Sequence, residues 1–364
     1  MKSIPSLQRC TGLTFASAVF CGVLLLMLAG CSPTERVIDN TNPTYTLYAA
    51  ADGGDINTTL QPANASVAQA LFRQANGESL AGTVTLIKRF RNDTLYLMIP
   101  SAKRIEVVNE KTFKRIATIS TAPRTPVDMC FSNSSTAFVA NNDSTVSVID
   151  ITVFRAVRDI TVGKNPVAIA SVENRVCVCN RDDNTISIIQ TNGVSSYTVL
   201  QTIPAGTAPS FVAPDFDKQE FVIVSRGAGK VSGSELRTPA ELMYYNIKTN
   251  TLSQPVTLNQ LGANPEDVDP SGLITAQGEI GFIMLDGEIT VLDTRGNSFL
   301  SAIGTDGRYS LASYNDFRRD IVFATKPGAG SGEPTSVSSR WALNGGIFAD
   351  SSLVVSERLP EMRV

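Results

Sequence analysis

The stretch that decides the fold is residues 126–166, which read PVDMCFSNSSTAFVANNDSTVSVIDITVFRAVRDITVGKNP. It contains four short runs rich in apolar and β-branched residues, at 126–132, 136–142, 144–150 and 157–163. Turn-forming Asn, Asp, Ser and Gly residues lie between and beside the runs. Runs of this length, bounded by turn residues, predict four consecutive β-strands, after which the pattern starts again.

The third run of this unit recurs along the chain. Its copies are IEVVN at 105–109, VSVID at 146–150, ISIIQ at 186–190, LMYYN at 242–246 and ITVLD at 289–293. Successive copies end 40 to 56 residues apart, and a fainter copy ends at Asn344. Prolines that open the first run recur at similar intervals, at Pro126, Pro166, Pro209 and Pro265. Proline suits the first residue of a strand because it lacks an amide donor. Two markers that agree indicate an internal repeat.

Four strands every 40 to 50 residues are the spacing of β-propeller blades. The sequence therefore predicts an all-β fold, a β-propeller of six to seven four-stranded blades around a central axis. Units from Thr83 to Val364 number six. Residues 44–82 leave two alternatives open. Either they form a seventh, irregular blade that joins the chain ends, with a first strand at 45–49, or they form an extension with an amphipathic helix over 65–80. We favour seven blades.

Three short motifs in the best-preserved units carry a resemblance to a known family. They are FVAN at 138–141, VSVID at 146–150 and GKNP at 163–166. Together they resemble the YVTN-type β-propeller repeat, which is common in exported bacterial proteins. The resemblance is to a structural motif, because its Asn and Asp residues suit turns in which side chains bond to the backbone. It implies a propeller and does not indicate an active site.

The first residues of the chain predict export and a lipid anchor. Lys2 and Arg9 precede the uncharged run 11–27, which ends in Leu28, Ala29, Gly30 and Cys31. A basic start, an apolar stretch and small residues before a cleavage point form a signal peptide. The last four residues resemble the bacterial lipobox, which implies that Cys31 is lipidated and becomes the first mature residue. The alternative is an uncleaved membrane anchor of about 20 residues.

These features divide the chain into three parts. Residues 1–30 are the predicted lipoprotein signal peptide, 31–43 a flexible tether from Cys31, and 44–364 a single β-propeller domain. Either reading of the leader places the domain outside the cytoplasm. Ser32 follows the cysteine, which in lipoproteins of two-membrane bacteria implies the outer membrane, with the domain facing the periplasm or the cell surface.

The composition excludes several classes of function. The chain contains no histidine, so Ser-His-Asp and Cys-His catalysis, His-ligated zinc and His-ligated haem are excluded. The formal charge is −3, and it becomes −5 when the leader with its two basic residues is removed. A general nucleic-acid partner is therefore not expected, because phosphate binding needs a basic surface.

Three cysteines follow Cys31, at positions 130, 177 and 179. Cys177 and Cys179 are two residues apart in a predicted strand, so both should point to the same face. We expect them to be buried as small hydrophobic residues. A disulfide between Cys130 and Cys177 or Cys179 is an open alternative.

Two long turns between second and third strands, at 226–238 and 326–340, predict a ligand-binding rim. They are rich in Gly and Ser and have little apolar content to bury, so they suit a binding surface, although long surface loops are also tolerated without function. Their basic residues are Arg226, Lys230, Arg237, Lys326 and Arg340. The inter-blade turns should add Arg124, Lys164 and Arg308 to this face. Carboxylates should make the face mixed: Asp143, Asp182, Asp183, Glu235, Asp286 and Glu333.

The function most consistent with these features is that of a non-enzymatic scaffold that binds a protein, a peptide or an envelope polymer. We expect no cofactor and no metal, a membrane contact through the lipid on Cys31, and a monomer. The alternative is a propeller enzyme of the lactonase or quinone-dependent dehydrogenase type. A lactonase would hold Ca²⁺ with converging oxygen ligands, to which Asp143, Asp286 or Glu288 could contribute.

Overall fold

The computed structural model describes the chain from residue 45 to residue 354, with gaps. The described ranges are 45–51, 55–61, 70–91, 93–192, 196–228, 238–258, 268–276, 280–285, 288–294, 298–303, 310–314, 321–326, 337–344 and 347–354. The predicted signal peptide, Cys31 and the tether lie outside these ranges. Within them, no helix is long and apolar enough to cross a membrane.

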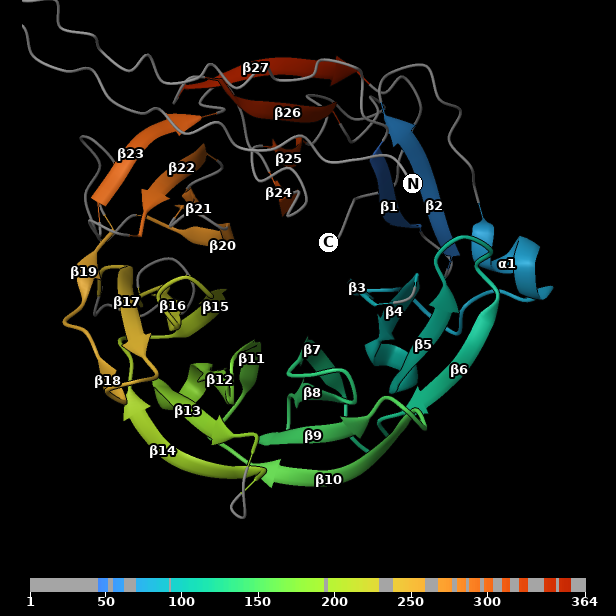
Figure 1. The fold of residues 1–364 in the computed structure, drawn as a ribbon, viewed down its shortest axis with the longest axis horizontal. Coiled ribbons are helices and arrows are strands. Elements are labelled where there is room, and N and C mark those ends of the chain that lie inside the picture. The colour runs from blue at the N-terminus through green and yellow to red at the C-terminus, as the bar shows by residue number, and fades with distance from the viewer. Residues whose placement is uncertain are drawn as a thin grey trace, which may run out of the picture. The chain divides into compact units, whose positions relative to one another are not determined.

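The stretch that opened the sequence analysis forms one four-stranded antiparallel sheet. Its strands are β7 (Pro126–Phe131), β8 (Thr136–Asn141), β9 (Thr145–Asp150) and β10 (Arg155–Thr161). They pair in chain order, each strand with the next, as Figure 1 shows. The four strands predicted from the four runs are therefore confirmed.

Sheets of the same topology precede and follow it in the described part of the chain. The first comprises β3 (Leu86–Phe90), β4 (Thr94–Ile99), β5 (Arg104–Asn109) and β6 (Arg115–Ser120). The next comprises β11 (Pro166–Val172), β12 (Arg175–Asn180), β13 (Thr185–Gln190) and β14 (Thr198–Pro204). Two further sheets comprise β20 (Pro270–Ala276), β21 (Ile280–Leu285), β22 (Glu288–Asp293) and β23 (Ser298–Ile303), then β24 (Ser310–Tyr314), β25 (Ile321–Lys326), β26 (Val337–Asn344) and β27 (Ile347–Val354).

The two sequence markers of the repeat are confirmed with one correction. Every copy of the third run lies in the third strand of a sheet, and Pro126, Pro166 and Pro209 are the first residues of first strands. The prediction that Pro265 opens the first strand of a unit was wrong. That residue lies outside the described ranges, and the first strand of its sheet begins at Pro270. A proline opens this strand too, which is why the pattern was assigned to the wrong one.

One sheet departs from the pattern in its outermost strand. It comprises β15 (Pro209–Asp215), β16 (Glu220–Ser225), β17 (Glu241–Asn246), β18 (Thr251–Leu252) and β19 (Val256–Thr257). Both β18 and β19 pair with β17, so they are two pieces of one fourth strand. Pro255 lies between them. Because proline cannot donate a backbone hydrogen bond, it is suited to such a break at a sheet edge.

The segment before β3 contains both a hairpin and a helix. Strands β1 (Tyr45–Ala51) and β2 (Asp55–Gln61) form a two-stranded sheet, so the strand expected at 45–49 is confirmed. The helix expected over 65–80 is only α1 (Leu71–Asn76), six residues long. The expected extent was wrong, since Gly77 ends the helix in a left-handed conformation with φ of 76°. Phe72 of this helix is fully buried.

Neighbouring sheets pack face to face through buried apolar clusters. One cluster joins Met98 and Val107 of the first sheet to Val139 and Ile149 of the second. The other face of the β7–β10 sheet, including Phe138, packs on the β11–β14 sheet. Similar clusters join the β11–β14 sheet to the β15–β19 sheet, and the β15–β19 sheet to the β20–β23 sheet. Both faces of these inner strands are therefore buried. This all-β arrangement of narrow antiparallel sheets with almost no helix is consistent with a β-propeller-like fold.

The motif residues have two different structural roles. The Asp150 carboxylate accepts a hydrogen bond from the backbone N–H of Thr152 (2.9 Å), and so begins the turn after the third strand as expected. The expectation was wrong for Asn141, which is fully buried and donates to the hydroxyls of Thr145 (3.1 Å) and Ser147 (3.0 Å). Its amide joins the second and third strands from within the sheet, because it precedes the turn rather than lying in it.

A polar contact recurs between the third and fourth strands, and in it a buried serine of the third strand meets an exposed polar residue of the fourth. Ser147 donates to Asp159 across the β9–β10 pair (2.8 Å), and the hydroxyls of Ser187 and Thr202 meet at the equivalent place, 3.5 Å apart. In the β3–β6 sheet, the third-strand residue equivalent to Ser147 and Ser187 is Glu106, which lies opposite Thr118 of β6. A buried carboxylate there requires cationic partners, because removing a charge from water is costly.

Arg104 and Arg115 supply the charge that Glu106 needs. Arg104 Nη2 lies 2.8 Å from one carboxylate oxygen, and Arg115 Nε donates to the other at 2.8 Å. The hydroxyl of Thr118 also donates to this second oxygen (2.7 Å). The Glu106 side chain is completely buried, whereas the two arginines are about one-third exposed. The cluster joins β5 to β6 by charge as well as by backbone bonds.

The three described cysteines are free thiols, so the disulfide alternative is wrong. Cys177 and Cys179 are both fully buried in the same apolar cluster, as their spacing predicted. Burial raises the pKa of each of the three thiols well above its usual range. They therefore remain neutral and act as small hydrophobic residues.

Candidate functional site

The turns of each sheet fall into two sets. Because neighbouring strands are antiparallel, the turns after the first and third strands lie at one end of the sheet. The turn after the second strand lies at the other end, together with the connection to the next sheet. We call this second end the rim end, because the basic loops were predicted there. We call the first end the pocket end, because turns at that end line a pocket.

Acidic and basic side chains pair with one another at the rim end. Arg124, which precedes β7, contacts Asp143 (2.5 Å) and Asp159 (2.9 Å). Lys164, which precedes β11, lies 3.8 Å from Asp183. Each cation thus comes from an inter-sheet connection and contacts an acidic residue in the turn after the second strand of the sheet that follows. The mixed charge predicted for this face is confirmed at these positions.

The structure places three of the five predicted rim residues. Arg226 follows β16 directly and holds one oxygen of Asp269 through Nη2 (2.6 Å) and Nε (3.1 Å). Lys326 is the last residue of β25, and Arg340 lies inside β26, opposite Phe323. The loop boundary at 340 was therefore wrong, since the strand begins at Val337. Lys230 and Arg237 lie outside the described ranges, as do Arg308, Glu235, Asp286 and Glu333.

Arg181 is a further basic residue of the rim end that sequence reasoning missed. It follows β12 as Arg226 follows β16, and its backbone N–H donates to Asn165 just as that of Arg226 donates to Ala208 (both 3.0 Å). Its Nε is buried without a hydrogen-bond partner. Burial and then the charge of Arg226 lower the pKa of Arg181. The match between successive sheets could have revealed it.

Of the three carboxylates named for a lactonase-type site, Asp143 is engaged in other bonds, Asp286 lies outside the described ranges, and Glu288 opens β22. Asp143 accepts from the hydroxyl of Thr145 (2.6 Å) as well as from Arg124. Although its partial burial opposes the change, these bonds lower the pKa of Asp143. Among the described residues, no group of three or more Cys, Asp or Glu side chains is placed to hold a metal ion.

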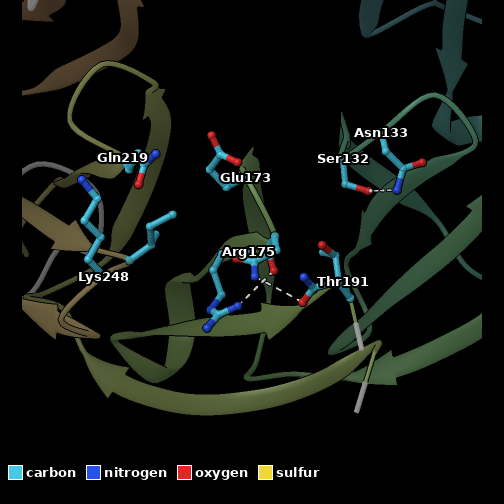
Figure 2. Close-up of a pocket in the computed structure, with 10 residues that line it drawn as sticks. Ser132, Asn133, Glu173, Arg175, Thr191, Gln219 and Lys248 are labelled. Atoms are coloured by element: carbon cyan, nitrogen blue, oxygen red, sulfur yellow. Dashed lines mark hydrogen bonds between the residues drawn. The ribbon is translucent and has the colours of Figure 1, made fainter. Parts of the chain in front are cut away.

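The pocket end carries a cavity of about 550 Å³. Turns after the first strands of three successive sheets, with the residue that opens β12, contribute Ser132, Asn133, Glu173, Asn174, Arg175 and Gln219. Turns after the third strands of two of these sheets contribute Thr191, Asn192, Ile247 and Lys248. Figure 2 shows Arg175 between Gln219 and Lys248 on one side and Thr191 and Ser132 on the other.

Backbone geometry holds the lining residues in place. Glu173 and Gln219 occupy equivalent hairpin turns and both have positive φ, of 50° and 58°. Asn174 accepts the backbone N–H of Thr191 (3.0 Å) through its carbonyl and donates its side-chain amide to Asn192 (3.2 Å). Two turns of one sheet are thereby tied together, so one wall of the pocket is preformed.

Comparisons with known proteins support the fold and do not identify an activity. Neither a known protein-family model nor a curated protein matches the chain. Among solved structures, the chain is similar to hydrazine synthase of Kuenenia stuttgartiensis, with a TM-score of 0.55 and 13% sequence identity. The match covers 69% of this chain and 73% of that one. At this identity the likeness shows a shared fold alone.

Sequence reasoning did not find the pocket. Its lining residues are mostly Ser, Thr, Asn, Glu, Gln and Lys in short turns, a composition that is common in exposed turns. The signal that drew attention to the other end was loop length. The pocket instead arises where turns of ordinary length from three sheets converge, which only the packing of those sheets brings about.

Proposed function

We propose that the protein is an exported, lipid-anchored β-propeller that acts as a non-enzymatic binding scaffold for a protein, a peptide or an envelope polymer. The observation that carries the binding role is the polar pocket shared by three successive sheets. A rigid stack of sheets holds such turns in fixed positions, which suits recognition. The pairing of Asp143 and Asp183 with cations speaks against a catalytic role of these two carboxylates.

We also propose that the sheets close into a ring of seven blades, with the β1–β2 hairpin contributing to the seventh. Support comes from the way each inner sheet buries both of its faces against neighbours. The first and last sheets of an open stack would each leave an apolar face exposed. A two-stranded hairpin such as β1–β2 is marginal on its own, so it requires further strands or a packing partner.

The binding proposal predicts that filling the pocket abolishes partner capture. The full chain, purified in detergent, serves as bait in an extract of the cell envelope, and captured molecules are identified by mass spectrometry. Asn192→Trp places a large side chain in the pocket from an exposed turn, so capture should be lost while the protein stays folded. The matched control is Asn142→Trp, which changes an exposed turn residue at the rim end and should leave capture unchanged.

The same assay separates the pocket from the predicted basic rim. Shortening the loops between the strands, at 227–237 and 327–336, to the length of the turn at 142–145 removes the long loops and should spare capture. If loop shortening abolished capture and Asn192→Trp left it unchanged, the ligand would bind at the rim end. That result would overturn the proposal that the pocket binds it. The five basic residues would then be tested by replacement with serine and by raising salt, which screens exposed charges over about 8–10 Å.

The lipid anchor predicts a complete loss of membrane attachment in Cys31→Ser. The thiol is the group that takes the lipid, and serine preserves the size of the side chain without it. Labelled palmitate should enter the parent protein and not the variant, and the variant should move to the soluble fraction. A Cys10→Ser variant, altered in the same leader upstream of the cleavage point, is the control and should be labelled normally. Normal labelling of the Cys31 variant would overturn lipidation there.

A further inference from the structure

Three charged side chains line the pocket and are not paired with one another or with other charges. They are Glu173, Arg175 and Lys248, and within the described part of the chain none of them forms an ion pair. At the rim end, by contrast, Arg124, Lys164 and Arg226 each contact a carboxylate. The pocket therefore keeps two cations and one carboxylate available to a ligand.

Arg175 is the best placed of the three to bind an anion. It opens β12 and is half-buried. Nη1 donates weakly to the Asn174 carbonyl (3.3 Å), and Nε is buried with no partner. A guanidinium presents its N–H groups as a planar fork, so the weakly bonded Nη1 and the neighbouring Nη2 match the two oxygens of a carboxylate. Because this geometry is planar, lysine would not reproduce it.

The remaining lining residues favour a peptide over a base or a sugar. They are hydroxyl and amide side chains, such as those of Thr191, Asn192 and Gln219, with Ile247 as the apolar contribution. Amides donate and accept hydrogen bonds as a peptide backbone does. None of the ten lining residues is aromatic, so the pocket offers no ring on which a base or a sugar could stack.

We propose that the pocket binds an acidic segment of a polypeptide, with one carboxylate held by the fork of Arg175 and further negative charge attracted by Lys248. This inference rests on the proposed binding function and names its ligand class. Figure 2 shows Glu173 on the same pocket, above Arg175 in this view. Its carboxylate opposes a second acidic group close by, so it limits how many acidic side chains the pocket accepts.

The experiment measures binding of two short peptides to the full chain in detergent by fluorescence anisotropy. One peptide alternates Asp with Gly, the other alternates Asn with Gly, and both carry a neutral fluorophore. The acidic peptide should bind at least about tenfold more tightly, the difference expected when a charged group replaces a neutral one in a hydrogen bond to a guanidinium. The Asn peptide has nearly the same shape, so it isolates the charge.

Variants of the three residues should have distinct effects on the acidic peptide. Arg175→Gln should weaken binding by about tenfold or more, and Arg175→Lys should recover little of it because the fork is lost. Lys248→Gln should weaken binding about twofold to fivefold, as expected for an exposed charge. Glu173→Gln should tighten binding by a similar factor, because a repulsive charge is removed.

The matched control is Arg181→Gln. Arg181 lies at the opposite end of the same sheet, is also partly exposed, and also has a buried Nε without a partner. Its replacement removes the same charge from the protein and should leave peptide binding unchanged. Melting curves of all variants confirm that they are folded, and an unchanged melting temperature of Arg175→Gln separates lost binding from a structural effect.

Several results would overturn the inference. They are equal binding of the Asp and Asn peptides, an effect of Arg181→Gln as large as that of Arg175→Gln, or no binding of the acidic peptide at about 1 mM. These outcomes leave the proposed function to its own test. If Asn192→Trp still abolishes partner capture, the pocket binds a ligand of another class. If it does not, the binding function of the pocket fails as well.

Discussion

Replacing Glu106 with alanine is expected to lower the free energy of unfolding by about 3 kcal/mol. The carboxylate is completely buried and lies between Arg104 and Arg115. Removing it leaves Arg104 without a counter-charge beside the apolar core, and it leaves Arg115 with the exposed Glu78 as its remaining partner. The value lies at the low end of the range for a broken buried pair, because both arginines are about one-third exposed and can reach water. Urea unfolding followed by circular dichroism measures the change.

Glu78→Ala is the matched control for this change. Glu78 pairs with the same Arg115, at 2.5 Å, but its side chain is 58% exposed. Its removal should cost less than about 1 kcal/mol, since an exposed ion pair contributes little. A loss of similar size in the two variants would contradict the role given to the buried carboxylate. It would mean that the buried Glu106 carboxylate stabilises the fold no more than the exposed Glu78 carboxylate does.

Replacing Phe138 with alanine is expected to cost about 3–5 kcal/mol. Phe138 comes from the FVAN motif and is fully buried between the β7–β10 and β11–β14 sheets. The centroid of its ring lies 5.9 Å from that of Tyr197, which directly precedes β14 of the next sheet. Removing the ring opens a cavity between two sheets that cannot move together without disturbing their other neighbours. Phe138→Leu retains most of the volume and should cost less, about 1.5 kcal/mol.

Phe216→Ala provides the control with the same chemical change. Phe216 is 58% exposed and follows β15 in a turn. Its replacement should alter the free energy of unfolding by no more than about 0.5 kcal/mol. If Phe138→Ala were as mild as this control in the same urea titration, the face-to-face packing of these two sheets would not be a main source of stability.

The repeat in the sequence was sufficient to predict the local fold. Each short apolar run can bury its side chains only as a narrow strand, and the turn residues between runs set where strands end. The third strands follow the copies of VSVID, and the first strands follow Pro126, Pro166 and Pro209. Errors arose where one signal served two positions, as at Pro265 and Pro270, and where a helix end depended on Gly77.

The sequence by itself determined the compositional limits and the repeat: a chain without histidine, and units of four strands. Only the tertiary structure decided which charges are available. Asp143 and Arg226 looked free in the sequence, but each contacts a partner from a distant segment. No signal in the sequence singled out Arg175, yet convergent turns of three sheets place it in a pocket where no carboxylate among the described residues pairs with it. The physical reason is that strand formation depends on neighbours along the chain, whereas charge pairing and pockets depend on how separate sheets pack.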